Sequence, residues 1–271
     1  MSNVNILESF ITGKKANQKL NEDGLVITKD FIAVIDGASN TINFDGCSGG
    51  LIAKNILAEG ISKLNSDITG FEAINFLNNL LNEAQKENPE AQKDPSKRLM
   101  ASILIYSVYN KQIWSYGDCK YRINNKVYQF DKKIDELNAQ VRCFVNQSEM
   151  QRGCTESQLI KNDIGANFIK PLLEYQHLFS NKNCEFGYPI LDGFALNESF
   201  FVCEDVHDGD IIILATDGYP QLLLTLEDSE RFLKDVLQQD PLFIKDNKMV
   251  KGFYEGYNSF DDRTFIKFVV N

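Results

Sequence analysis

Five short acidic motifs stand where apolar runs of this sequence begin or end. They are Glu22-Asp23-Gly24, Asp36-Gly37, Gly117-Asp118, Asp217-Gly218 and Asp261-Asp262. A buried strand holds its last residue rigidly, and a glycine after the acid lets the backbone turn and expose a carbonyl group. Carboxylates that separate strands bring together repel one another unless a cation neutralises them. Oxygen ligands without thiolate or imidazole favour Mg²⁺ or Mn²⁺, and two such ions can activate a water and clamp a phosphoryl group.

A single motif of this kind is usually a turn, because Asp-Gly is a common turn dipeptide. The repetition of the same chemistry at the same kind of strand end favours a metal site. The chain has only two histidines, His177 and His207, and His207 lies in the polar turn VHDGD. A histidine-rich metal site or a Ser-His-Asp triad is therefore disfavoured.

The elements that must position these acids are mainly strands. The apolar run Phe31–Ile35 predicts a strand covered on both faces. The sequence of residues 99–130 predicts a meander of strands that tight turns join. Further strands are predicted over 199–206, 210–216 and 264–270, and helices over 51–64, 71–84, 166–175 and 226–238. The hairpin connections favour a β-sandwich flanked by helices over a parallel sheet.

Composition and charge limit the partners that can be expected. The chain has 271 residues and a net charge of −10, which disfavours nucleic acid and anionic membranes as partners. No apolar run approaches the roughly 18 residues needed to span a bilayer. The start MSNVNILESF lacks the pattern of a signal peptide, and the six cysteines contain no C-x-x-C pair. These features predict a cytoplasmic protein with reduced thiols.

The order of the motifs resembles that of the PPM family, the type-2C-like metal-dependent protein serine/threonine phosphatases. The matching series is NEDG, FIAVIDG, MASILIYSVYNKQIWSYGDCKYRI, DIIILATDGYPQLL and DDRTFIKF, which spans Glu22 to Phe268. The resemblance implies an α+β fold, a four-layer α-β-β-α sandwich with two antiparallel-rich central sheets, as a single domain over residues 1–271. It implies hydrolysis of phosphoserine or phosphothreonine on a phosphorylated protein substrate. A hydroxide activated by two metal ions would attack in line, without a phosphoenzyme intermediate.

The resemblance also assigns roles to the acids. Asp36 would bridge two ions, Mg²⁺ or Mn²⁺, and Glu22 and the Gly37 carbonyl would serve one of them. Asp217 and Asp261 would hold the other ion, so that Asp36 and Asp217 form the catalytic centre. The full implied set of metal residues is Glu22, Asp23, Asp36, Gly37, Asp118, Asp217 and Asp261.

Two of these residues have less direct roles, and two positions depart from the family pattern. Asp23 would act through metal-bound water, and Asp118 would help hold a third, looser ion. Gln18 stands where many members have an arginine that contacts the substrate phosphate, so Lys19, or else Lys14 or Lys15, would supply the positive charge. Ala38 stands where animal-type members have a histidine, which bacterial-type members also lack.

Two other functions remain open on the same fold. The missing arginine suggests a catalytically weak or inactive domain that binds a phosphopeptide or another partner as a sensor. Alternatively, the domain could be a metal-dependent hydrolase of a small phosphorylated metabolite.

Overall fold

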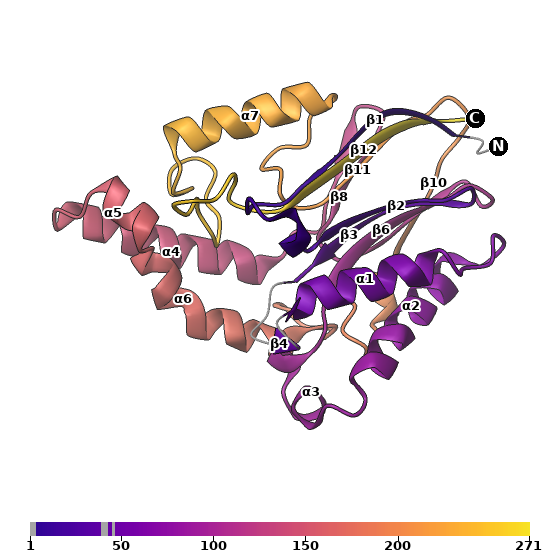
Figure 1. The fold of residues 1–271 in the computed structure, drawn as a ribbon, viewed down its shortest axis with the longest axis horizontal. Helices are drawn as coiled ribbons and strands as arrows, with labels where there is room; N and C mark the ends of the chain where they lie inside the picture. The colour runs from indigo at the N-terminus through magenta and orange to yellow at the C-terminus, as the bar shows by residue number, and fades with distance from the viewer. Residues whose placement is uncertain (1–3, 39–42, 45–46) are drawn as a thin grey trace.

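Two five-stranded sheets face each other as a sandwich in the computed structural model, which describes residues 4–38, 43–44 and 47–271 (Figure 1). One sheet has the strand order β1-β12-β11-β8-β9 and the other β10-β7-β6-β3-β2, with antiparallel neighbours throughout. The strands of the first sheet are β1 (Val4–Thr12), β8 (Lys120–Ile123), β9 (Lys126–Tyr128), β11 (Ile211–Ala215) and β12 (Arg263–Val270). Those of the second are β2 (Asp23–Ile27), β3 (Phe31–Gly37), β6 (Ala101–Ser107), β7 (Gln112–Tyr116) and β10 (Val202–Asp205). The short strands β4 (Asn43–Phe44) and β5 (Cys47–Ser48) pair with each other.

Helices cover both outer faces of the sandwich (Figure 1). Helices α1 (Gly49–Ile61) and α2 (Gly70–Gln85) pack on the second sheet, and α7 (Leu226–Gln239) lies over the first. Helices α4 (Lys133–Gln151), α5 (Glu156–Lys161) and α6 (Ile164–Tyr175) extend from one end, and α3 (Pro89–Lys93) follows α2. The 3-10 turns are η1 (Gln18–Leu20), η2 (Pro95–Lys97), η3 (Gln176–Phe179) and η4 (Glu198–Phe200). The expected four-layer α-β-β-α sandwich is confirmed.

Strand β3 is buried on both faces, as its continuous apolar run predicts. Ile32 and Val34 belong to the core between the sheets, whereas Ala33 and Ile35 pack in the core beneath α1 and α2. Alternation of side chains along a strand makes this two-sided burial possible. The result is a central strand whose last residues are held from both sides.

Several elements differ from the sequence-based expectation, among them β2, α3 and α5, which were not predicted. Strand β1 was not predicted, and the expected strand over 199–206 is only the four residues of β10, preceded by η4. Helix α4 was also not predicted, because the face it buries interrupts its apolar residues with Asn138, Arg142 and Asn146. Arg142 donates from Nε to Asp163 Oδ2 at 2.9 Å, which ties α4 to the start of α6.

The helices of the described segments do not include one with the length and apolar character needed to cross a membrane.

Candidate active site

Strand pairing brings the acidic motifs to one end of the sandwich. Asp23 lies opposite Asp36 in the register of β2 and β3. Strand β11 ends just before Asp217, and its antiparallel neighbour β12 begins just after Asp261. Five acids from the predicted motifs line one cavity of about 410 Å³: Asp36, Asp118, Asp217, Asp261 and Asp262.

Asp36 and Asp217 come from opposite sheets to the same cavity, where the charge of Asp217 acts on the Asp36 carboxyl group. Burial raises the pKa of Asp36 well above its ordinary value, and the charges of Asp217, Asp23 and Asp118 raise it further. Burial alone would also raise the pKa of Asp217, but the ammonium groups of Lys251 and Lys120 outweigh it and lower that pKa. The same surroundings therefore move the two pKa values in opposite directions, up for Asp36 and down for Asp217.

Glu22 and Gly37 lie against the N-terminus of α1. The Gly37 N–H donates to the Glu22 carbonyl at 3.1 Å, and the Glu22 carboxylate accepts from the Ser48 hydroxyl at 2.6 Å. A Cβ on Gly37 would lie 2.3 Å from the carbonyl oxygen of Gly50. Only glycine fits at such an approach of two backbones, so the Asp36-Gly37 motif is also a packing requirement.

Asp23 joins three strands across the sandwich. Its Oδ2 accepts from the Thr216 hydroxyl at 2.5 Å and from the Thr264 hydroxyl at 2.9 Å. Burial, with the charges of Asp262 and Asp217, raises the pKa of Asp23 to about 7, although the two threonine hydrogen bonds lower it. Asp23 does not line the cavity but fixes the strands whose ends do.

Asp118 follows a turn that only glycine can make. Gly117 has φ +132°, and a Cβ there would lie 2.3 Å from the Ser102 side chain. The Ser102 hydroxyl donates to Asp118 Oδ1 at 2.6 Å, which fixes the carboxylate at the cavity wall.

Two lysines provide counter-charge to the acids. Lys14 Nζ lies 3.0 Å from Asp261 Oδ1 and 3.7 Å from Glu22 Oε2. Lys251 Nζ lies 3.7 Å from Asp217 Oδ2 and also pairs with Asp261. Lys251 was not identified from the sequence, since it lies in an irregular segment, ten residues before Asp261, with no motif around it.

Gln18, at the position of the missing arginine, positions Lys14. The Gln18 amide accepts from the Gly13 N–H at 2.7 Å and donates to the Lys15 carbonyl at 2.8 Å. This closes the loop that carries Lys14, whose N–H donates to Asp262 at 2.7 Å. Lys19, the residue expected at the substrate phosphate, is exposed on η1 and does not line the cavity. Lys14, the alternative from the same loop, does.

The far wall of the cavity carries residues that sequence reasoning missed. Lys132 Nζ lies 3.2 Å from Asp135 and 4.3 Å above the ring of Tyr188. Burial, helped by the charge of Lys132, lowers the pKa of His177 to about 4, so His177 is neutral at pH 7. His177 Nδ1 is buried and has no hydrogen-bond partner among the described residues. This part of the wall thus places the Lys132–Asp135 ion pair in the same lining as a neutral imidazole.

The donor set fits a hard divalent cation in its chemistry. It consists of carboxylates and a backbone carbonyl, with no thiolate or imidazole, and these are the ligands that Mg²⁺ and Mn²⁺ prefer. Within the described residues, no three side chains of His, Cys, Asp or Glu converge closely enough to surround an ion. The carboxylates instead engage one another and the two lysines, so ion binding would require these contacts to rearrange.

Comparison with known proteins identifies relatives by structure alone. No model of a protein family matches the chain, and no curated protein matches its sequence. The Mycobacterium tuberculosis serine/threonine phosphatase PstP/Ppp aligns over 98% of this chain and 99% of its own, with 12% identity and a TM-score of 0.50. The catalytic domain of PstP in complex with 2 manganese ions aligns over 97% and 98%, with 13% identity and a TM-score of 0.49. The PPM Ser-Thr phosphatase MsPP from Mycobacterium smegmatis aligns over 98% and 100%, with 12% identity and a TM-score of 0.48.

At these identities the similarity concerns the fold and not the activity. The match extends over almost the whole of both chains, so it covers both sheets and the covering helices. The chain has the fold that its motif series led us to expect, that of serine/threonine phosphatases such as PstP/Ppp.

Proposed function

We propose that this protein is a metal-dependent phosphatase that hydrolyses phosphoserine and phosphothreonine on proteins in the cytoplasm. The observation that carries the proposal is the convergence of Asp36 and Asp217 from opposite sheets in a cavity that Asp118, Asp261 and Asp262 also line. A carboxylic acid with a strongly raised pKa beside an ionised one is typical of a catalytic centre.

Mg²⁺ or Mn²⁺ would be held by the acids at the strand ends. Asp36, Gly37 and Glu22 would serve one ion, and Asp217 and Asp261 a second. Asp23 would bind through a metal-bound water, and Asp118 would help to hold a third ion. When bound, such ions supply charge stabilisation of a phosphoryl oxygen and make water a better nucleophile at neutral pH.

The residues of the chain itself bind and orient the substrate. Lys14 and Lys251 place two ammonium groups at the carboxylates, where they can receive the anionic phosphate. As point charges they replace the bidentate arginine that Gln18 does not provide. The N–H and Oδ contacts among Gln18, Asp262 and the Lys14 loop keep that charge in place without a direct contact to substrate.

The test is release of phosphate from a phosphothreonine peptide by purified protein with added Mn²⁺. We expect turnover in the wild type and a loss of at least about a hundredfold in Asp36→Asn and Asp217→Asn. Thr155→Ala, in the cap of the remote helix α5, serves as the control. Absence of turnover in metal-loaded, folded protein would contradict the proposal.

A phosphopeptide-binding domain without turnover is the second candidate. It is favoured by the ion pairs of Lys14 and Lys251, which already neutralise part of the acidic cluster. Phosphopeptide binding that a chelator leaves unchanged, without phosphate release, would support this function. A small-molecule phosphomonoesterase would show the opposite pattern, with turnover of sugar phosphates or nucleotides exceeding that of peptides.

A further inference from the structure

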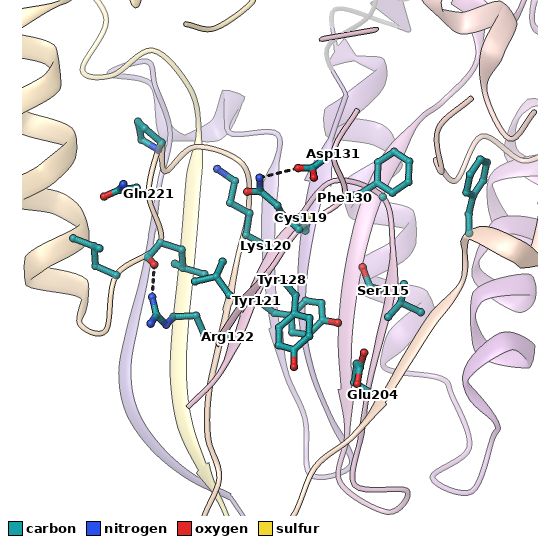
Figure 2. Close-up of a pocket in the computed structure, with 18 residues that line it drawn as sticks. Ser115, Cys119, Lys120, Tyr121, Arg122, Tyr128, Phe130, Asp131, Glu204 and Gln221 are labelled. Atoms are coloured by element: carbon teal, nitrogen blue, oxygen red, sulfur yellow. Dashed lines mark hydrogen bonds between the residues drawn. The ribbon is translucent and has the colours of Figure 1, made fainter. Parts of the chain in front are cut away.

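A second cavity, of about 850 Å³, opens between the last strands of the two sheets (Figure 2). Strand β9 is the edge of one sheet and β10 the edge of the other, so the sandwich is not closed on this side. The volume lies in the range of small-molecule sites. Figure 2 shows Lys120 and Arg122 on one side of this pocket and Glu204 on the other.

Two basic side chains line this pocket without a direct ion pair to a described carboxylate, although the charge of Lys120 also acts on Asp217. Arg122 donates to the carbonyls of Leu222 at 2.7 Å and Asn125 at 3.0 Å, and Lys120 donates to the Tyr219 carbonyl at 2.6 Å. No described carboxylate forms an ion pair with either. Arg122 is only 9% exposed, and its Nε has no hydrogen-bond partner in the described part of the chain. Burying a charge without a counter-ion is costly, so these two groups favour an anion.

The rest of the lining includes four aromatic side chains. The rings of Tyr121 and Tyr128 are stacked with centroids 4.8 Å apart, and Phe130 meets Phe200 edge to face at 5.7 Å. Of the two acids at the pocket, Asp131 accepts from Gln129, and Glu204 lies across from the basic pair. The charges are thus separated, with the basic pair at one wall and the aromatic rings between.

We propose that this pocket binds a small organic anion that carries an aromatic ring. Its carboxylate or phosphate contacts Lys120 and Arg122, and its ring packs against the Tyr121–Tyr128 pair. The matching features are the charge of the basic pair, the aromatic lining and the size of the pocket.

The pocket also touches both segments that carry the candidate active-site acids. Lys120 follows Asp118 by two residues, and Tyr219 follows Asp217 by two. The hydrogen bond from Lys120 to the Tyr219 carbonyl joins these segments directly. An anion at Lys120 therefore changes the restraint on the Asp217 segment and, resting on the proposed function, the rate of phosphate release.

Binding is measured on metal-free protein, which keeps the test independent of turnover. The probes are 2-naphthoate and its neutral analogue 2-naphthamide, titrated by isothermal calorimetry. We expect naphthoate to bind about tenfold more tightly, as a charge-assisted hydrogen bond allows. Inorganic phosphate and phenylphosphonate then show whether the anion alone or the ring with it is required.

A blocking variant places a large side chain at the pocket without disturbing the core. Val127 is 41% exposed on β9, so Val127→Trp fills the pocket from an edge strand. Ile27→Trp is the matched control, since Ile27 is 46% exposed on β2, the opposite edge of the second sheet. Naphthoate binding should be lost in Val127→Trp and retained in Ile27→Trp. Arg122→Gln should abolish the preference for naphthoate over naphthamide.

Equal affinity for the acid and the amide, or binding that survives Val127→Trp, would overturn the proposal. Coupling to the active site is read from amide hydrogen exchange of residues 216–223 in the same metal-free protein. Exchange there should slow or accelerate with naphthoate in the wild type but not in Val127→Trp, and unchanged exchange would refute the coupling. Naphthoate binding that is lost in Val127→Trp, in a protein without phosphatase turnover, would support the anion site and contradict only the proposed function.

Discussion

At the scale of single residues, the site is a balance between carboxylates and ammonium groups. Burial raises the pKa of Asp36, whereas the nearby lysines outweigh burial at Asp217 and lower its pKa. Both acids belong to Asp-Gly motifs that the sequence alone identifies as candidate site residues. Lys251 could not be found in the same way, since its place depends on the path of an irregular segment and not on a period or a motif.

Removing Lys251 should strengthen metal binding. In the present arrangement its ammonium group pairs with Asp217 and Asp261, the residues proposed to hold one ion. A neutral side chain no longer competes, so Lys251→Met should bind Mn²⁺ about tenfold more tightly in calorimetry. Lys248→Met, an exposed lysine of the same segment, is the control and should leave the affinity unchanged. Equal affinities in the wild type and Lys251→Met would show that Lys251 does not compete.

His177 should make the protein less stable in acid. Burial and the charge of Lys132 lower its pKa from 6.5 to about 4, so unfolding allows it to take up a proton that the folded state resists. Its contribution to the free energy of unfolding is complete above pH 6.5 and is lost as the pH falls towards 4. His177→Gln should therefore flatten the pH dependence in urea titrations over this window. The exposed His207→Gln should keep the wild-type slope, and an unchanged slope in His177→Gln would refute this assignment.

At the scale of elements, strands that end in acids were the most predictable part of the molecule. Continuous apolar runs made β3 and β11 recognisable, and tight turns did the same for β6 to β9. Strand β1 was missed because it lies at a sheet edge and leaves Ile6, Leu7 and Ile11 exposed, which obscures an alternating pattern. Helix α4 was missed because polar residues interrupt its buried face. Arg142 and Asn146 of that face bond to Asp163 at the start of α6, a contact that no local sequence pattern predicts.

The contact between β3 and α1 should tolerate no side chain. A Cβ on Gly50 would lie 2.6 Å from the Gly37 carbonyl oxygen and 2.8 Å from the Glu22 carboxylate. Gly50→Ala should therefore lower the free energy of unfolding by about 1–3 kcal/mol, measured by urea denaturation. Gly60→Ala in the same helix is the control, because a Cβ there meets only leucine side chains that can move. A Gly50→Ala protein as stable as Gly60→Ala would refute this close contact.

At the scale of the whole molecule, two sheets from distant parts of the sequence form one site. The hydrogen bonds of Asp23 to Thr216 and Thr264 span 193 and 241 residues along the chain. The order of the motifs was enough to anticipate this sandwich. The balance of carboxylates and lysines inside the cavity could not be predicted, because it depends on side chains from segments without a recognisable sequence pattern.

Metal should stabilise the entire fold, because ligands from both sheets would be joined by the same ions. At a Mn²⁺ concentration a hundred times the Kd, linkage gives about 2.7 kcal/mol, or roughly 5 to 10 °C in Tm for a domain of this size. Scanning calorimetry should show this increase in the wild type and a much smaller one in Asp36→Asn. An equal increase in both proteins would place the binding elsewhere.

The most direct test of the central claim is anomalous diffraction from crystals soaked in Mn²⁺. The account predicts two anomalous peaks at the carboxylates of Asp36 and Asp217, with Lys251 moved away from Asp261. Well-ordered crystals that show no peak at these carboxylates at saturating Mn²⁺, with Lys251 still paired to Asp261, would contradict it.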